Sequence, residues 1–203
     1  MIYKPSMFKS ILRISIIFVF TVAISACASV VSDRPLGDIT SAVEDKNLLG
    51  IWQSTDTELQ QSYLAIMQRD DGYLKLIAFH NTDDRPWEFL GYVTEPYGER
   101  YLNLRQFVEE ENAYKPEEHY NIVHYFINYK DELELSLFEP EFFKKAINDE
   151  MIKGTVHKEK TDFGTFETGI RIEDSMERLI DLLSKNNKQD YLTEPIIFHR
   201  YKQ

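Results

Sequence analysis

The sequence predicts a mainly β protein, an antiparallel barrel or curled sheet with two short helices late in the chain. Roughly eight or nine short apolar runs are separated by turn compositions, which is typical of hairpin-linked strands. In the expected strand at 132–138, leucines alternate with polar residues, which indicates one buried face and one solvent-exposed face. Residues 119–129 are apolar on both faces, so we expect that strand to be covered on both sides. An α+β fold is the alternative.

The elements follow one another with recognisable boundaries. Asp70-Asp71-Gly72 predicts a tight turn between two of the strands. Residues 108–118 are acidic and are expected to form a solvated loop. The ordered part opens at 48–52, and strands are expected at 62–69, 73–80, 87–95, 101–107, 119–129, 132–138, 152–158, 166–172 and 196–201.

Two segments carry helix signals. Pro140 suits the first position of a helix, and Phe142, Phe143, Ala146 and Ile147 would form its apolar stripe. A second helix is expected from about residue 176 to 184, because Asp174-Ser175-Met176-Glu177 resembles a cap with its reciprocal acid.

The first 26 residues have the pattern of a secretory signal peptide. Lys4, Lys9 and Arg13 supply positive charge, residues 14–24 are apolar, and the small residues Ser25 and Ala26 follow. This order of regions is typical of a secretory signal. The apolar run is shorter than the roughly 20 residues that cross a bilayer comfortably. An uncleaved signal anchor is the alternative.

Ile24-Ser25-Ala26-Cys27 resembles the lipobox of bacterial lipoproteins. The resemblance implies cleavage between Ala26 and Cys27 and attachment of lipid to the Cys27 thiol. Two or more acyl chains anchor a protein stably. Ala28 in place of aspartate implies export to the outer membrane, with the domain facing the periplasm. The alternative is an ordinary cysteine after a plain signal.

Cys27 is the only cysteine, so the mature chain can form no intrachain disulfide and packing must hold the fold. Residues 28–47 are polar and include Pro35 and Gly37, which predicts a flexible tether after the acylated Cys27. About 20 such residues reach on the order of 25 Å. A single β-rich domain is expected at 48–203.

The net charge excludes one class of partner. The chain carries −11, and loss of the signal's three basic residues leaves 20 basic against 34 acidic residues, a net charge of −14. Such a surface repels nucleic acid and anionic headgroups. We therefore expect no nucleic-acid partner, and membrane contact through the N-terminal acyl chains alone.

Gly50-Ile51-Trp52 resembles the Gly-x-Trp at the first strand of lipocalins and related calycins. The resemblance implies that Trp52 closes one end of a barrel while a late arginine packs across its ring. Arg200 is the matching residue, and such a cation–π pair contributes up to about 2 kcal/mol. The helix expected at Pro140 departs from the simple eight-strand meander. The Leu-x-Gly-x-Trp start also resembles uncharacterised bacterial lipoproteins, which implies no activity.

No catalytic or cofactor motif is present. Glycine-rich phosphate loops, the Gly-x-Ser-x-Gly elbow and His-Glu-x-x-His are all missing from the sequence. His119 and His124 lie five apart on one expected strand, so they should not share a metal. The other histidines are also expected to be polar or edge residues rather than metal ligands: His80, His157 and His199. The adjacent acids are expected to be solvated turn residues, because the ligand spacing of a calcium loop is missing: Asp70, Asp71, Asp83 and Asp84. We expect no cofactor, no metal and no enzymatic activity.

The remaining signal is aromatic. Several Tyr and Phe residues lie on expected strands, where they either fill the core or line an apolar pocket: Tyr63, Phe79, Phe89, Tyr92, Tyr101, Tyr125, Phe126. The sequence favours a lipid-anchored, non-catalytic envelope protein that binds a small apolar or lipid ligand. The alternative is an envelope interaction protein that docks a partner through an exposed face or through the acidic run at Glu109, Glu110, Glu111, Glu117 and Glu118.

Overall fold

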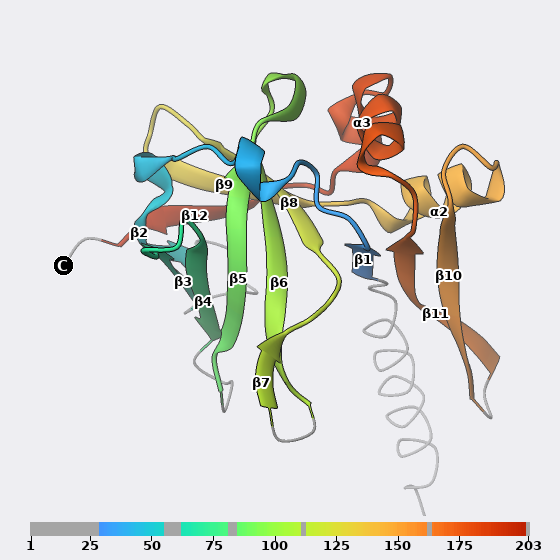
Figure 1. Ribbon diagram of the computed structural model, residues 1–203, viewed down its shortest axis with the longest axis horizontal. Helices are drawn as coiled ribbons and strands as arrows, with labels where there is room; N and C mark the ends of the chain where they lie inside the picture. Colours follow the sequence, from blue (N-terminus) through green and yellow to red (C-terminus); the bar gives the residue numbers. More distant parts are fainter. Residues whose placement is uncertain (1–28, 55–61, 81–84, 111–112, 162–163, 202–203) are drawn as a thin grey trace, which may run out of the picture.

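Eight antiparallel strands close into a barrel in the computed structural model of the chain (Figure 1). The structure describes residues 29–54, 62–80, 85–110, 113–161 and 164–201. The barrel strands are β2 (Gly50–Ser54), β3 (Ser62–Gln68), β4 (Leu74–His80), β5 (Trp87–Thr94), β6 (Tyr101–Glu110), β8 (Asn121–Ile127), β9 (Glu132–Leu137) and β12 (Ile196–Arg200). The predicted mainly β fold is confirmed.

The barrel is an up-and-down meander. Each barrel strand pairs with the next one along the chain, and β12 pairs with both β9 and β2, which closes the ring. Closure removes the open edges that an isolated sheet would expose. This arrangement is compatible with a lipocalin-like fold. β7 (Ala113–Pro116) pairs with the end of β6, so part of the expected acidic loop is a β-hairpin.

Strand β8 is covered on its inner face and on part of its outer face, whereas its sequence predicted cover on both. Val123 and Tyr125 are buried in the interior of the barrel. Ile122 is 3% exposed in a second hydrophobic core on the outside of the barrel wall. Phe126, on that outer face, is exposed because the second core does not extend to it.

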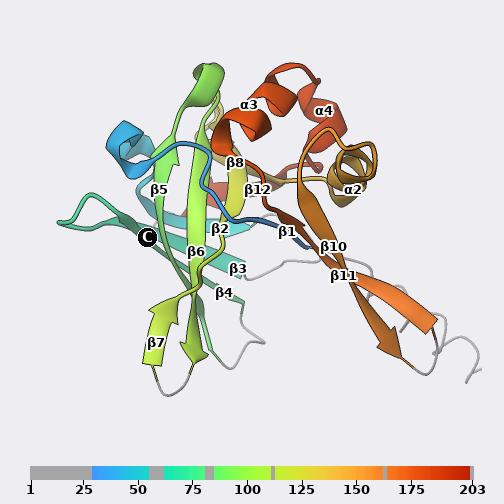
Figure 2. The same ribbon diagram turned by 45° about the vertical axis from the view of Figure 1, so that its right-hand side comes forward.

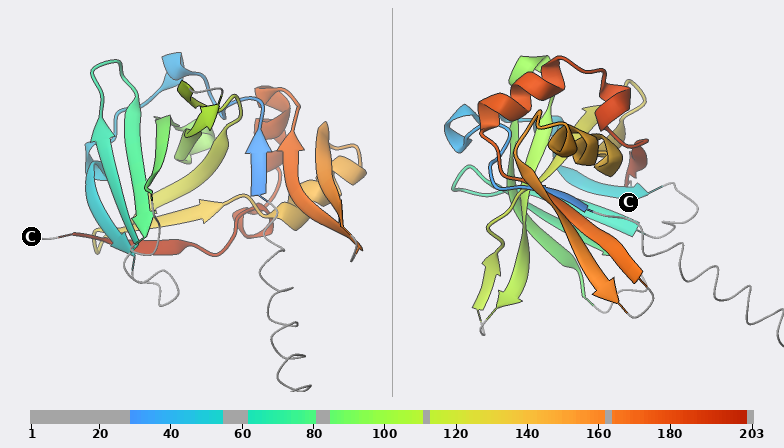
Figure 3. Two further views of the ribbon diagram at one scale, coloured as in Figure 1. Left: turned by 90° about the horizontal axis from the view of Figure 1, so that it is seen from below. Right: turned by 90° about the vertical axis from the view of Figure 1, so that its right-hand side faces the viewer.

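A second layer covers part of the barrel wall. It is inserted between β9 and β12 and consists of α2 (Pro140–Asn148), β10 (Gly154–Thr161), β11 (Gly164–Ile172), α3 (Met176–Ser184) and α4 (Lys188–Tyr191). Figure 2 shows the helices beside the barrel and the β10–β11 hairpin extending past them. Both late strands exist, but they form a separate sheet with β1 (Ser29–Ser32) instead of joining the barrel. Figure 3 shows this small sheet standing to one side.

The two predicted helices pack by the stripes that their sequences indicated. α2 begins at Pro140, and α3 begins after Ser175, whose Oγ accepts a hydrogen bond from the Arg178 amide at 3.3 Å. Both helices are amphipathic and bury their apolar residues in the outer core: Phe143, Ala146, Leu179, Leu182 and Leu183. The one-turn helix α4 was not predicted.

The prediction of a flexible tether at 28–47 is wrong for residues 29–47. Strand β1 pairs in parallel with β11 from Ser29 to Ser32, and Asp33 forms a bidentate ion pair with Arg171 at 2.7 and 3.2 Å. The guanidinium hydrogen bond holds the pKa of Asp33 below its usual value. Two short 3-10 helices follow, η2 (Ile39–Ser41) and η3 (Lys46–Leu48).

Leu36 is the main apolar anchor of this segment and is fully buried. Its amide donates to Asn103 Oδ1, and its carbonyl accepts from the Thr94 hydroxyl. Asn103 Nδ2 also donates to Thr94 Oγ1 at 2.9 Å, so the buried polar groups satisfy one another. Gly37 follows with φ +108°, and a side chain there would collide with Thr94. The segment is therefore part of the folded domain.

We expect Leu36→Ala to lower the free energy of unfolding by about 2–5 kcal/mol, because it leaves a cavity in the outer core. Ile39→Ala, at a position 36% exposed in the same segment, should cost less than about 0.5 kcal/mol. Urea unfolding of the mature chain measures both values. Equal small effects would show that the segment is a tether after all.

Candidate functional site

Trp52 closes one end of the barrel, which we call the closed end. Its side chain is fully buried, and its Nε1 donates to the Leu48 carbonyl at 2.9 Å. The Arg200 guanidinium lies 4.1 Å from the centroid of the Trp52 ring, as the resemblance to lipocalins implies. Arg200 also donates to the carbonyls of Leu49 and Asn47, at 2.9 and 2.7 Å. One arginine thus joins the last strand to the chain entering the first.

Gly50 is required by this arrangement. Its φ is +130°, a conformation that residues with a side chain rarely adopt. A Cβ atom there would lie 3.0 Å from the nearest guanidinium nitrogen of Arg200. The glycine therefore permits both the entry angle of β2 and the close approach of the arginine.

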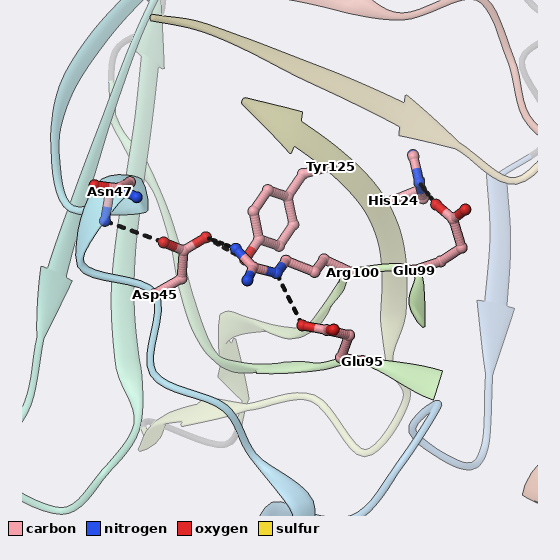
Figure 4. Close-up of polar contacts among 7 residues, drawn as sticks. All are labelled: Asp45, Asn47, Glu95, Glu99, Arg100, His124 and Tyr125. Carbon is pink, nitrogen blue, oxygen red and sulfur yellow. Dashed lines mark hydrogen bonds and ion pairs between the residues drawn. The ribbon is translucent and has the colours of Figure 1, made fainter. Parts of the chain in front are cut away.

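A polar cluster holds the chain over the closed end (Figure 4). The Asp45 side chain is only 4% exposed; it accepts from Arg100 at 2.7 Å, from the Tyr125 hydroxyl at 3.0 Å and from the Asn47 amide at 3.1 Å. Arg100 also donates to Glu95 at 3.0 Å. Burial raises the pKa of Tyr125, so this phenol remains a hydrogen-bond donor. The contacts fix η3 and place Leu48 above Trp52.

His124 and Glu99 form the other half of this cluster. His124 Nε2 lies 3.0 Å from Glu99, which also accepts from Lys188 at 2.8 Å. Burial lowers the pKa of His124 below 6.5, so its imidazole is neutral at pH 7. Burial opposes ionisation of Glu99, but the hydrogen bonds from Lys188 and His124 outweigh it and lower the pKa of this carboxyl. Every charge here has a partner, which is typical of a structural network.

The other end of the barrel, which we call the mouth, holds an apolar cavity of about 500 Å³. This volume lies within the usual range of small-molecule sites, roughly 300–1,000 Å³. Its lining extends from the strand ends remote from the closed end inward to Leu64, which pairs with Trp52. The lining residues are Ser62, Tyr63, Leu64, Leu76, Ala78, Phe79, Trp87, Phe89, Leu102, Leu104, Val123, Leu135, Leu137, Ile196 and Phe198. Ser62 and Tyr63 are the lining residues that carry a hydroxyl, and the Tyr63 hydroxyl accepts a hydrogen bond from Gln53 Nε2 at 3.3 Å. Such a cavity is suited to holding an uncharged apolar group.

The structure separates the aromatic residues that the sequence could not. Tyr63, Phe79 and Phe89 line the cavity. Phe126 is exposed on the outer wall. The other members are buried in the cores: Tyr92, Tyr101 and Tyr125. Sequence reasoning missed the contributions of Ala78, Leu104 and Ile196, because an inward-facing apolar residue has the same pattern whether it fills a core or borders a cavity.

His119 and His124 contact different carboxylates, but His119 precedes β8, so the two do not share one strand, contrary to the prediction. His119 Nδ1 lies 3.1 Å from Asp33, whereas His124 contacts Glu99. Within the described residues, no group of three or more His, Cys, Asp and Glu side chains is placed to hold a metal ion.

The remaining polar candidates are dispersed. His199 lies 3.6 Å from Glu132, His157 is exposed, and Asp71 pairs with Arg69 in the β3–β4 turn. The signal peptide and the side chains of several candidates fall outside the described residues: Ala26, Cys27, His80, Asp83, Asp84, Glu110 and Glu111.

Comparison with known proteins does not assign a family to this chain. No protein-family model, curated protein or solved structure matches this chain. In the part of the chain that the structure describes, no helix is both long and apolar enough to cross a membrane.

We expect Arg200→Ala to lower the free energy of unfolding by about 2–4 kcal/mol, because it removes the stack on Trp52, the hydrogen bonds to the Asn47 and Leu49 carbonyls and the ion pair with Asp131. Arg200→Lys should recover less than half of that loss, since an ammonium cannot reproduce the planar fork. Arg69→Ala, which breaks an exposed ion pair with Asp71, should cost about 0–1 kcal/mol. Urea unfolding provides the comparison, and a lysine variant as stable as the parent would contradict the stacking argument.

Proposed function

We propose that this protein is a lipid-anchored component of the cell envelope whose barrel binds a small apolar or lipid ligand without catalysing a reaction. The single observation that carries the binding proposal is the apolar cavity of about 500 Å³ at the mouth of the barrel. A barrel whose interior was filled by its own side chains would leave no space for a ligand.

The chemistry of the cavity lining restricts the ligand. Burying a methylene group contributes about 0.8 kcal/mol, so an alkyl or aromatic body gains affinity with each carbon that enters. The described lining contains no carboxylate, amine, guanidinium or imidazole. A charged headgroup would lose its hydration there without compensation. The ligand should therefore bury an uncharged body and leave any polar group at the mouth.

The same lining supports binding over catalysis. Acid–base or nucleophilic chemistry needs paired titratable groups within hydrogen-bond reach of a bound molecule. The titratable cluster around Asp45 and Glu99 lies at the closed end instead, where its charges pair with one another. The two features occupy different ends of the barrel.

The anchor is supported by the sequence. Ile24-Ser25-Ala26-Cys27 follows a basic start and a short apolar run, as in bacterial lipoproteins. Lipid on Cys27 would hold the acidic domain at a membrane. The proposed location is the outer membrane, with the domain facing the periplasm.

Straight-chain alcohols of increasing length should bind the mature chain about fourfold more tightly per added methylene until the cavity is full. Displacement of an environment-sensitive alkyl dye measures this series. Ala78→Trp, which fills the interior, should abolish binding. Ala65→Trp is the matched control, because Ala65 lies on the neighbouring strand β3 and is not among the residues that line the cavity. Unchanged binding by Ala78→Trp would exclude the cavity as the site.

Cys27→Ser should abolish lipid attachment in the full chain. Metabolic labelling with a palmitate analogue should label the parent and an Ala28→Ser control, but not the Cys27 variant. Membrane fractionation should then recover the parent and the control with the envelope. A Cys27→Ser protein that is processed and retained like the parent would refute the anchor.

A further inference from the structure

We infer that the anchored domain holds the mouth of its cavity toward the bilayer that carries the anchor, so that the cavity takes up an acyl chain from that membrane. This inference rests on the proposed function and adds the source and class of the ligand. It follows from where the folded chain begins relative to the mouth.

Strand β1 begins on the mouth side of the molecule. It runs parallel to β11, with Ser29 opposite Gly169 and Ser32 opposite Ile172. Ser29 is therefore nearer than Ser32 to the end of β10 and the start of β11, which lie at the lower side of Figure 1 together with β7. After Ser32 the chain runs the other way, through Leu36 to Leu48 at the closed end.

The strand ends around the cavity define the same side. The lining includes Trp87, the first residue of β5, and Leu137, the last residue of β9. β8 also starts at this end, and Ser32 forms a bridge with Tyr120 just before that strand. The chain thus enters the fold level with the start of β8 and the middle of β6, on the mouth side of the segment that covers the closed end.

The short connection between the lipid-bearing Cys27 and β1 restricts how the domain can be oriented on the membrane. Two peptide units separate Cys27 from Ser29, and an extended residue spans at most about 3.6 Å. The attachment point therefore lies within about 7 Å of the start of β1, whereas a flexible tether of residues 28–47 would have reached on the order of 25 Å. β1 itself is fixed by its pairing with β11 and by the Asp33–Arg171 ion pair.

The chemistry of the mouth suits a membrane interface. Exposed apolar and aromatic side chains gather at these strand ends: Phe79 (40% exposed), Trp87 (58%), Tyr114 (57%) and Leu137 (47%). Trp and Tyr are enriched where proteins meet headgroups. Two of the acids toward this end have basic partners: Glu88 lies 2.6 Å from Lys75, and Glu109 lies 3.7 Å from Arg85. More distant negative charge is screened beyond about 8–10 Å.

The orientation is tested with a fluorophore on a single introduced thiol in the lipidated protein, reconstituted into phosphatidylcholine vesicles that contain spin-labelled lipid. Lipid attachment consumes the Cys27 thiol, so the introduced cysteine is the sole free one. Tyr114→Cys places the label at the mouth, and Tyr129→Cys, at a position 95% exposed in the β8–β9 turn, places it at the closed end. We expect several-fold stronger quenching at position 114. Glu109→Cys provides a second mouth position if Tyr114→Cys fails to fold.

A spacer variant supplies the control. Inserting about 20 Gly and Ser residues between Ala28 and Ser29 should let the domain move on the order of 25 Å from the membrane. Quenching at position 114 should then fall to the level at position 129, and transfer of a spin-labelled acyl chain into the cavity should slow. Alcohol binding by the mature chain without Cys27 should remain unchanged.

The outcomes separate this inference from the proposed function. Alcohol binding with equal quenching at both positions, or with stronger quenching at position 129, would overturn the orientation and leave the binding function standing. Loss of quenching at position 114 in the spacer variant alone would support the orientation. A mature chain that binds no alcohol would overturn the proposed function, and uptake of an acyl chain with it.

Discussion

The stacking of Arg200 on Trp52 is the interaction on which the rest of the structure depends. It connects the last barrel strand to the first, and the same guanidinium holds the backbone at Asn47 and Leu49. Without a disulfide, the ring must be closed by packing and hydrogen bonds between residues about 150 positions apart in the sequence. Contacts of such long range form late and slowly during folding. The first and last barrel strands therefore become ordered in the same step of folding.

The described residues fill the barrel at one end and surround a cavity at the other. Leu48, Trp52, Tyr125 and Leu133 fill the interior near the closed end, and the Asp45 cluster holds the chain above them. Toward the mouth the inward-facing residues no longer meet across the barrel, which leaves the apolar space. Among the described residues, 43–49 pack over the closed end and contribute nothing to the cavity lining, which accounts for the asymmetry.

The sequence predicts the barrel strands well, because each presents a local pattern bounded by turn residues. Glu132–Leu137 alternates, and β8 is apolar on both faces, so burial follows directly from side-chain direction. The stack of Arg200 on Trp52 was expected from a resemblance to lipocalins rather than from periodicity. The helices were predictable from Pro140, Ser175 and their apolar stripes. These features depend on a few neighbouring residues.

The features that were missed depend on distant partners. Residues 29–47 contain no periodic stripe, and their order comes from β11 and from the Asn103 amide, neither of which their own sequence reveals. Likewise, β10 and β11 have strand patterns that do not specify which sheet they join. The cavity was undetectable for a similar reason: a pattern indicates that Ala78 or Leu104 faces inward, but not what lies opposite.

The parallel pairing of β1 with β11 also determines how the domain responds to mechanical load. Tension applied at the N-terminal end passes first into the hydrogen bonds of a four-residue strand, before it reaches the closed ring. Detachment of β1 and the segment after it would release residues 29–47, an extension of up to about 65 Å. The strand would act as a breakable link that lengthens under strain while the barrel stays intact.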